Sequence, residues 1–341
     1  MRETSNRRTF LRRTSWLATA GLIGGAFSLS AASSVRKTIV GHQNFQYQVD
    51  KSWGDLDPNQ YPVMHCHEMV MDEQGRLFLL TTEQRNNVLI YNKDGKLLDC
   101  WTLNLPEPHG LTIVGSGSDQ TLWITDSEVG RVLNCTLDGR IIRELELPKG
   151  VLSTQQSYKP TETAVASNGD IYVADGYGSN YILQYDSKGQ FKHFFGGTHH
   201  FDCAHGITLD PRGLEPTLLI TSQAGNNFQR WSLAGKHLVT YSLPGLSICR
   251  PVIHGDQTYF AVITTKSWRD YDGMLAVLDR DMQVVSLPGG SAPSATQDFT
   301  DVVYDGMTFL NPHDVCIDED ENLYVPQWFS GRTYPVRLKR V

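Results

Sequence analysis

The chain has 341 residues, a formal net charge of −7 and a pI near 5.9, and 40% of its residues are hydrophobic. This length suits one large all-β domain or two ordinary domains. Beyond the amino end the only locally basic stretch is residues 337–340, which argues against a nucleic-acid partner. Six cysteines permit disulfides in an oxidising compartment, but buried thiols fit equally well, because four lie in or just before expected strands: Cys66, Cys203, Cys249 and Cys316.

Residues 1–34 have the features of a twin-arginine export signal. Arg7 and Arg8 precede Phe10 and Leu11, a glycine-rich apolar stretch follows over residues 16–29, and small residues end it. The stretch is shorter than the roughly 20 apolar residues that a bilayer span needs. We therefore expect export to the periplasm or the extracellular space, with no stable membrane span after signal removal. The alternative is an uncleaved membrane anchor.

The remaining chain, residues 35–341, repeats one pattern in units of about 40 to 50 residues, the range of propeller blades. Each unit reads strand, turn, strand, loop, strand, Asp/Gly turn, strand. The third unit shows it over residues 163–195, with hairpin turns at Asn168-Gly169 and at residues 186–189. In chain order, second strands are expected at residues 77–80, 122–125, 171–174, 218–221 and 323–325.

The last unit has three strands, and a segment near residues 44–49 is expected to supply its fourth. Such closure joins the two ends of the chain and removes open sheet edges. No helix of more than a turn or two is expected. The pattern predicts an all-β, six-bladed propeller that forms a single domain.

A histidine opens the first strand of four units, at His67, His109, His205 and His313. In a closed radial repeat, equivalent positions meet on the axis. Histidines that are far apart in sequence are therefore candidates to share one metal ion. His67 and the nearby His65 are left with three roles: a further ligand, a hydrogen-bond donor to a ligand, or a polar side chain that fills the channel.

Three phrases resemble those of NHL-repeat propellers, and more narrowly those of the peptidyl-α-hydroxyglycine α-amidating lyases: residues 108–111, 171–177 and 311–315. The similarity spans about residues 60 to 341. It implies a catalytic zinc ion on the axis, bound by His109, His205 and His313, and an open fourth position. It also implies that Tyr177 is the base that takes up the substrate hydroxyl proton.

The same resemblance implies a structural calcium ion. Its ligands here are Asp314 and the backbone carbonyls near Leu111 and Met69. Oxygen ligands of this mixed kind suit calcium.

The chain departs from the lyases at two arginine positions, where it has Thr82 and Gln223. Neither side chain replaces a guanidinium that binds a carboxylate with two hydrogen bonds. Arg85 and Arg250 are the candidates to reach into the tunnel instead, and Arg250 is taken with Tyr177 as a candidate catalytic residue.

Two functions remain open from the sequence. The first is a metal-dependent lyase or hydrolase acting on a small molecule or peptide, in the lyase form by C–N cleavage of an α-hydroxyglycine carbinolamide. The second is a non-catalytic scaffold that binds a protein or a glycan partner.

Overall fold

The computed structural model describes residues 38–152, 157–267, 270–329 and 331–341. The expected export signal, residues 1–34, lies outside the described residues. Lys37–Val341 forms one compact unit. In the described part of the chain all six cysteines are free thiols.

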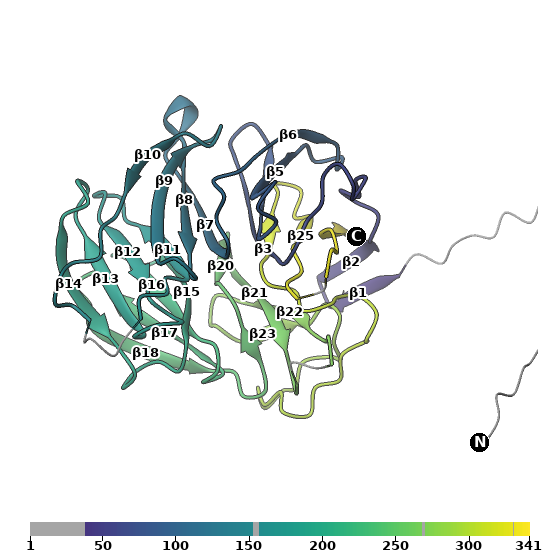
Figure 1. Cartoon of the computed structure of the whole chain (residues 1–341). Helices are drawn as coiled ribbons and strands as arrows, with labels where there is room; N and C mark the ends of the chain where they lie inside the picture. Colours follow the sequence, from purple (N-terminus) through teal and green to yellow (C-terminus); the bar gives the residue numbers. More distant parts are fainter. Residues whose placement is uncertain (1–37, 153–156, 268–269, 330) are drawn as a thin grey trace, which may run out of the picture. The chain divides into compact units, whose positions relative to one another are not determined.

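Six antiparallel sheets make up the described chain, and each is one blade of a β-propeller (Figure 1). Blades 1 and 2 contain β3 (Cys66–Met71), β4 (Leu77–Thr81), β5 (Val88–Tyr91) and β6 (Leu97–Trp101), then β7 (Pro108–Val114), β8 (Thr121–Asp126), β9 (Arg131–Thr136) and β10 (Ile141–Glu144). Blades 3 and 4 contain β11 (Glu162–Val165), β12 (Ile171–Ala174), β13 (Tyr181–Tyr185) and β14 (Phe191–Gly196), then β15 (Ala204–Asp210), β16 (Thr217–Ser222), β17 (Asn227–Ser232) and β18 (His237–Ser242). The predicted six-bladed all-β fold is confirmed.

Blade 5 has a broken inner edge. It contains β19 (Ser247–Ile248), β20 (Val252–His254), β21 (Gln257–Thr264), β22 (Met274–Leu278) and β23 (Val284–Ser286). Both β19 and β20 pair with β21, so the inner edge of this blade is interrupted between residues 248 and 252. This interruption positions Arg250, as described below.

Blade 6 joins the two ends of the chain. It contains β24 (Cys316–Ile317), β25 (Leu323–Val325) and β26 (Val336–Arg340) from the carboxy end, and β2 (Phe45–Asp50) and β1 (Ile39–His42) from the amino end. The predicted strand near residues 44–49 is therefore confirmed as β2, which pairs with β26 in the register Tyr47 to Arg340. The sequence did not predict β1, which adds a fifth strand.

The hydrophobic core lies between neighbouring blades. One cluster, for example, combines Phe78 of blade 1 with Ile124 of blade 2, and both side chains are fully buried. The inner strands β3, β7, β11 and β15 contact one another in sequence around the axis and lie toward the middle of the body in Figure 1. The single helix found in the described residues is a 3-10 turn, η1 (Gly117–Asp119), and none there is long and apolar enough to cross a membrane.

Candidate metal centre on the propeller axis

Each of three histidine-bearing inner strands breaks its register at the histidine. The irregularity lies between residues 66 and 69 in β3, between 108 and 111 in β7, and between 204 and 207 in β15. A β-bulge leaves a residue unpaired and redirects side chains. The repeated irregularity thus frees His67, His109 and His205 from regular pairing at equivalent points.

Four histidine rings meet at these points. The ring centroids of His109 lie 4.6 Å from His67, 4.7 Å from His205 and 4.9 Å from His313. His205 and His313 are 5.0 Å apart, and each of the four residues is about 1% exposed. The structure therefore brings the three expected zinc ligands together and adds His67 to them.

Two sets of three ligand atoms lie close enough together to hold an ion, and neither set contains both His109 and His205. The ligand atoms of His67, His109 and His313 all lie within 4.8 Å of one another, as do those of His205, Cys249 and His313. From the sequence, Cys249 was open to a disulfide or to a buried thiol in or just before an inner strand. In the repeat, Cys249 stands in blade 5 where four other blades have a histidine, and this was the only sequence signal of a role at the site.

Two of the histidines are anchored as metal ligands usually are. His109 Nδ1 donates to the carbonyl of Thr161 at 2.9 Å, and His313 Nδ1 donates to the carbonyl of His67 at 3.0 Å. A carbonyl only accepts, so each Nδ1 carries the proton and each Nε2 keeps its lone pair. Such a second hydrogen bond fixes the tautomer and the ring orientation of metal-binding histidines.

The other two histidines have unsatisfied nitrogens. Both ring nitrogens of His67, and Nδ1 of His205, are buried without a hydrogen-bond partner among the described residues. Burial lowers the pKa of all four histidines, that of His109 to about 4, so the rings are neutral. Neutral imidazoles with free lone pairs in a buried site fit a zinc-like ion, and unsatisfied buried nitrogens are rare otherwise.

Tyr177 contacts two members of the cluster. Its hydroxyl oxygen lies 2.9 Å from His109 Nε2 and 3.1 Å from His205 Nε2. The turn that carries it approaches blade 4 closely, because a Cβ on Gly176 would lie 2.2 Å from the carbonyl oxygen of Ala204. The residue as a whole is 42% exposed, while burial of its hydroxyl raises the pKa of Tyr177 well above its usual value. The phenol is therefore neutral in this state.

Glu107 is a site residue that the sequence analysis missed. Its Oε1 lies 3.5 Å from His67 Nε2, its side chain is 37% exposed, and burial raises its pKa. Its place two residues before His109 was the only sequence signal. A carboxyl group of raised pKa beside the histidines is a candidate to carry a proton.

Arg250 does not contact the histidine cluster through its hydrogen bonds. The guanidinium donates to both carboxylate oxygens of Asp314, at 3.2 and 2.6 Å, and to the carbonyls of Leu111 at 3.2 Å and Met69 at 3.4 Å. These are the atoms at which calcium was expected. Because a guanidinium already binds all of them, the set does not fit a calcium ion as it stands, and among the described residues no hydrogen bond joins Arg250 to Tyr177.

The positions of the missing arginines carry no charge in the structure either. Thr82 Oγ1 donates to the carbonyl of Met64 at 3.0 Å, and Gln223 Nε2 donates to Cys249 Sγ at 3.5 Å. Arg85 pairs with Glu83 at 2.9 Å, and its side chain is 63% exposed. Neither Arg85 nor Arg250 therefore replaces the lyase arginines through the contacts described.

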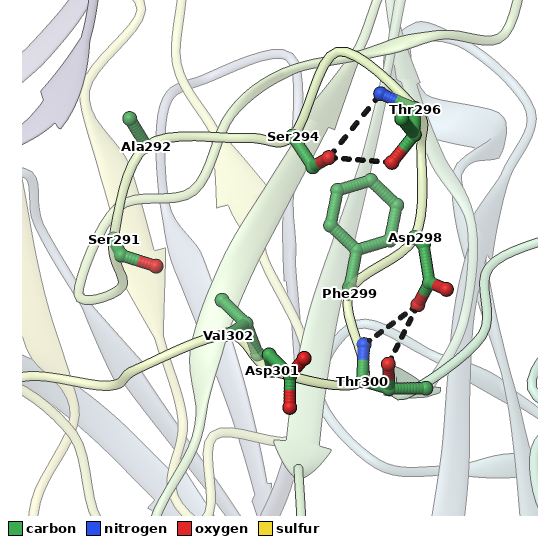
Figure 2. Close-up of a pocket in the computed structure, with 9 residues that line it drawn as sticks. All are labelled: Ser291, Ala292, Ser294, Thr296, Asp298, Phe299, Thr300, Asp301 and Val302. Atoms are coloured by element: carbon green, nitrogen blue, oxygen red, sulfur yellow. Dashed lines mark hydrogen bonds between the residues drawn. The ribbon is translucent and has the colours of Figure 1, made fainter.

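Two of the cavities formed by the described residues are lined by none of the four axial histidines. One of about 440 Å³ is lined by Arg250 and by inner-strand residues such as Met71, Ile113 and Ile317. Another, of about 290 Å³, is formed by residues 291–302 before blade 6 (Figure 2). The hydrogen bonds drawn there are local turn contacts: Thr296 N–H donates to Ser294 Oγ, the Ser294 and Thr296 hydroxyls bond to each other, and Thr300 donates to Asp298 through its N–H and its hydroxyl. No histidine lines either cavity except His254 in the first.

Sequence relatives share this repeat. No protein-family model matches the chain. It is 28% identical over 264 residues to a probable peptidyl-alpha-hydroxyglycine alpha-amidating lyase of Caenorhabditis elegans, a match covering 74% of this chain and 70% of the relative. It is 30% identical over 220 residues to NHL repeat-containing protein 3 of Mus musculus, covering 56% of this chain and 63% of that protein. The chain is a six-bladed β-propeller whose sequence relatives include NHL repeat-containing proteins and amidating lyases.

Solved structures agree on the propeller fold. Virginiamycin B lyase from Staphylococcus aureus superposes with a TM-score of 0.52 at 18% identity, over 80% of each chain. A streptogramin B lyase structure gives a TM-score of 0.55 at 13% identity, over 82% of this chain and 94% of that one. At these identities the likeness extends to the propeller architecture alone.

Proposed function

We propose that this propeller is a metal-dependent lyase that cleaves the C–N bond of an α-hydroxyglycine carbinolamide. The observation that carries the proposal is the cluster of four buried neutral histidines with the Tyr177 hydroxyl against two of them. The amidating lyases among its relatives make this reaction the first to test.

His109, His205 and His313 would hold the metal, with His67 as a further ligand. Zinc is the proposed ion, because imidazole ligands suit it and a catalytic zinc site keeps an open position. When bound, zinc acts as a Lewis acid on a substrate oxygen and lowers the pKa of a neighbouring phenol.

The chain's own groups would manage the protons. In the reaction the substrate hydroxyl loses its proton, a C=O bond forms, the C–N bond breaks, and the nitrogen takes up a proton to give an amide and glyoxylate. Tyr177 lies where it can accept the hydroxyl proton once it is ionised. Glu107, with its raised pKa and its position beside His67, is the proposed donor to the leaving nitrogen.

This chain lacks the two arginines that, by the resemblance to the lyases, would bind the substrate carboxylate. Thr82 and Gln223 stand there instead, and both are engaged in local contacts. This observation favours the second candidate function, a scaffold that binds a protein or glycan. Under the lyase proposal the same observation predicts weak substrate binding, seen as a high KM.

Metal analysis of the mature protein from residue 35 tests the site. We expect near-stoichiometric zinc in the native protein and its loss in His205→Ala and His313→Ala. His199→Ala is the control, because His199 is exposed in the loop before β15. Metal retained in both site variants would contradict a histidine-bound ion.

Glyoxylate release from an N-acyl-α-hydroxyglycine tests the reaction. Tyr177→Phe keeps the ring but loses the proton-accepting oxygen, so we expect kcat to fall by about 10²- to 10⁴-fold with zinc retained. Tyr181→Phe is the control, because the Tyr181 ring packs on Phe194 of β14, the outer strand of blade 3. Native protein that holds zinc and releases no glyoxylate would leave the scaffold function.

A further inference from the structure

A second ring of residues lies next to the histidines along the axis. It consists of the residue that follows each axial histidine, and of the equivalent residues after Thr161 and Cys249. We call this set the charged ring: Glu68, Gly110, Glu162, Gly206, Arg250 and Asp314. The equivalence of Thr161 rests on the contacts above, since His109 bonds its carbonyl as His313 bonds that of His67.

Arg250 is the single cation of the charged ring and joins several blades. It contacts blade 6 at Asp314, blade 2 at the carbonyl of Leu111, and blade 1 at the carbonyl of Met69. The side chains of Arg250 and Asp314 are 11% and 0% exposed. A guanidinium has five donors in one plane, and a bidentate bond to a carboxylate is its strongest pairing.

The local chain geometry brings Arg250 to this position. Inner strand β19 ends at Ile248, and β20 starts at Val252. The neighbouring blade has no side chain at Gly206, and a Cβ there would lie 2.5 Å from the Arg250 Cα atom. A glycine in the charged ring of blade 4 therefore lets the backbone of Arg250 come close to β15.

The ring holds three carboxyl groups around one guanidinium, and burial together with the neighbouring Glu162 and Asp314 raises the pKa of Glu68 well above its usual value. Besides Asp314, Glu68 Oε2 lies 3.7 Å and Glu162 Oε2 lies 3.8 Å from Arg250 Nε. Glu162 Oε2 has no hydrogen-bond partner among the described residues. Carboxylates and backbone carbonyls together form the kind of ligand set that binds calcium. The guanidinium occupies the centre of this set.

We propose that Arg250 is a built-in replacement for an axial calcium ion. Its guanidinium binds Asp314 and the carbonyls of Leu111 and Met69, the three groups that the resemblance to the amidating lyases assigns to calcium. An ion and the guanidinium compete for the same oxygens. The propeller therefore needs no calcium, and removing the Arg250 side chain opens a site for it. This inference is independent of the metal at the histidines.

Calcium dependence of thermal unfolding is the test. After chelation the native protein and Arg250→Ala are each reloaded with zinc and then titrated with calcium chloride or magnesium chloride. We expect no change in the native Tm with calcium. Arg250→Ala leaves buried carboxylates without their partner, and we expect its Tm to lie about 10 °C lower. Millimolar calcium should raise that Tm by several degrees by mass action.

Calorimetric titration with calcium gives a second readout. We expect about one calcium per Arg250→Ala chain and none per native chain. Arg131→Ala is the matched control, because Arg131 forms a bidentate pair with Glu144 at the surface, at 2.8 Å, and should stay insensitive to calcium. Stoichiometric calcium in the native protein would overturn the proposal. So would an Arg250→Ala chain that folds without taking up calcium, or that refolds neither with calcium nor without it.

Discussion

At the scale of single residues, the four axial histidines have the same protonation state for the same reason. Burial removes water from the charged form, and nearby histidines add to the penalty in His67, His205 and His313. Backbone carbonyls then fix the proton of His109 and of His313 on Nδ1. The result is a group of neutral imidazoles with buried lone pairs. Burying such unpaired nitrogens lowers the stability of the fold unless a ligand binds there.

This arrangement predicts acid sensitivity of the metal-free protein. An unfolded histidine titrates near pH 6.5, whereas folded His109 has a pKa of about 4. Between these values the unfolded chain binds more protons than the folded one, so the free energy of unfolding falls as the pH drops through 6.5 toward 4. Each histidine that stays neutral contributes about 1.4 kcal/mol per pH unit.

Urea unfolding of the chelated protein between pH 7.5 and 5 measures this slope. His67→Gln should reduce it, because one neutral imidazole is removed from the cluster. The exposed His199→Gln should leave it unchanged. Equal slopes in His67→Gln and in the native protein would show that His67 does not resist protonation.

At the scale of elements, close contact between inner strands depends on glycines at two bulges. Gly110 and Gly206 each follow an axial histidine, and their N–H groups donate to Thr125 Oγ1 at 2.8 Å and to Thr221 Oγ1 at 2.7 Å. A Cβ on either would meet backbone atoms of the next blade, at 2.5 Å in both cases. The His-Gly pair in the sequence thus combines a side chain for the axis with a backbone that allows the next blade to approach.

Gly206→Ala should therefore destabilise blade 4 against blade 5. The new methyl group meets the Cα and N atoms of Arg250, which cannot rotate away, so we expect a loss of about 1–3 kcal/mol in the free energy of unfolding. Gly213→Ala is the control, because Gly213 lies in an exposed loop. Chemical denaturation of both variants gives the comparison, and equal stability would show that the two blades can separate at this point.

At the scale of the whole propeller, closure depends on strands from opposite ends of the chain. β2 covers the edge of β26, Tyr47 is fully buried, and Asp50 pairs with Arg337 at 2.7 Å. Without β2, the edge of β26 would present unpaired backbone groups, a known route to aggregation. The circular arrangement also keeps the histidines of blades 1 and 6 together, because β24 packs on β3.

A chain that begins at residue 51 should therefore lose cooperative unfolding and aggregate. A chain that begins at residue 38 retains β1 and β2 and should unfold as the full chain does. Size-exclusion chromatography and the Tm distinguish the two. A monomeric truncation at residue 51 with an unchanged Tm would show that blade 6 closes without strands from the amino end.

The sequence by itself determined the repeat, the number of blades and the histidine columns at His67, His109, His205 and His313. Periodic patterns encode these features locally, because turn residues and alternating apolar residues act within one blade. The strand β2 was also predictable, since the last unit lacked one.

Only the tertiary structure decided which side chains meet across the axis. Repeat position alone treats Arg250 as a residue at the mouth of blade 5, yet its guanidinium reaches Asp314 of blade 6 and backbone of blades 1 and 2. Likewise, the ring of His67 packs on that of His109, and the carboxyl group of Glu107 lies near the His67 ring. Such contacts depend on strand breaks and glycines in neighbouring blades, and no single repeat contains that information.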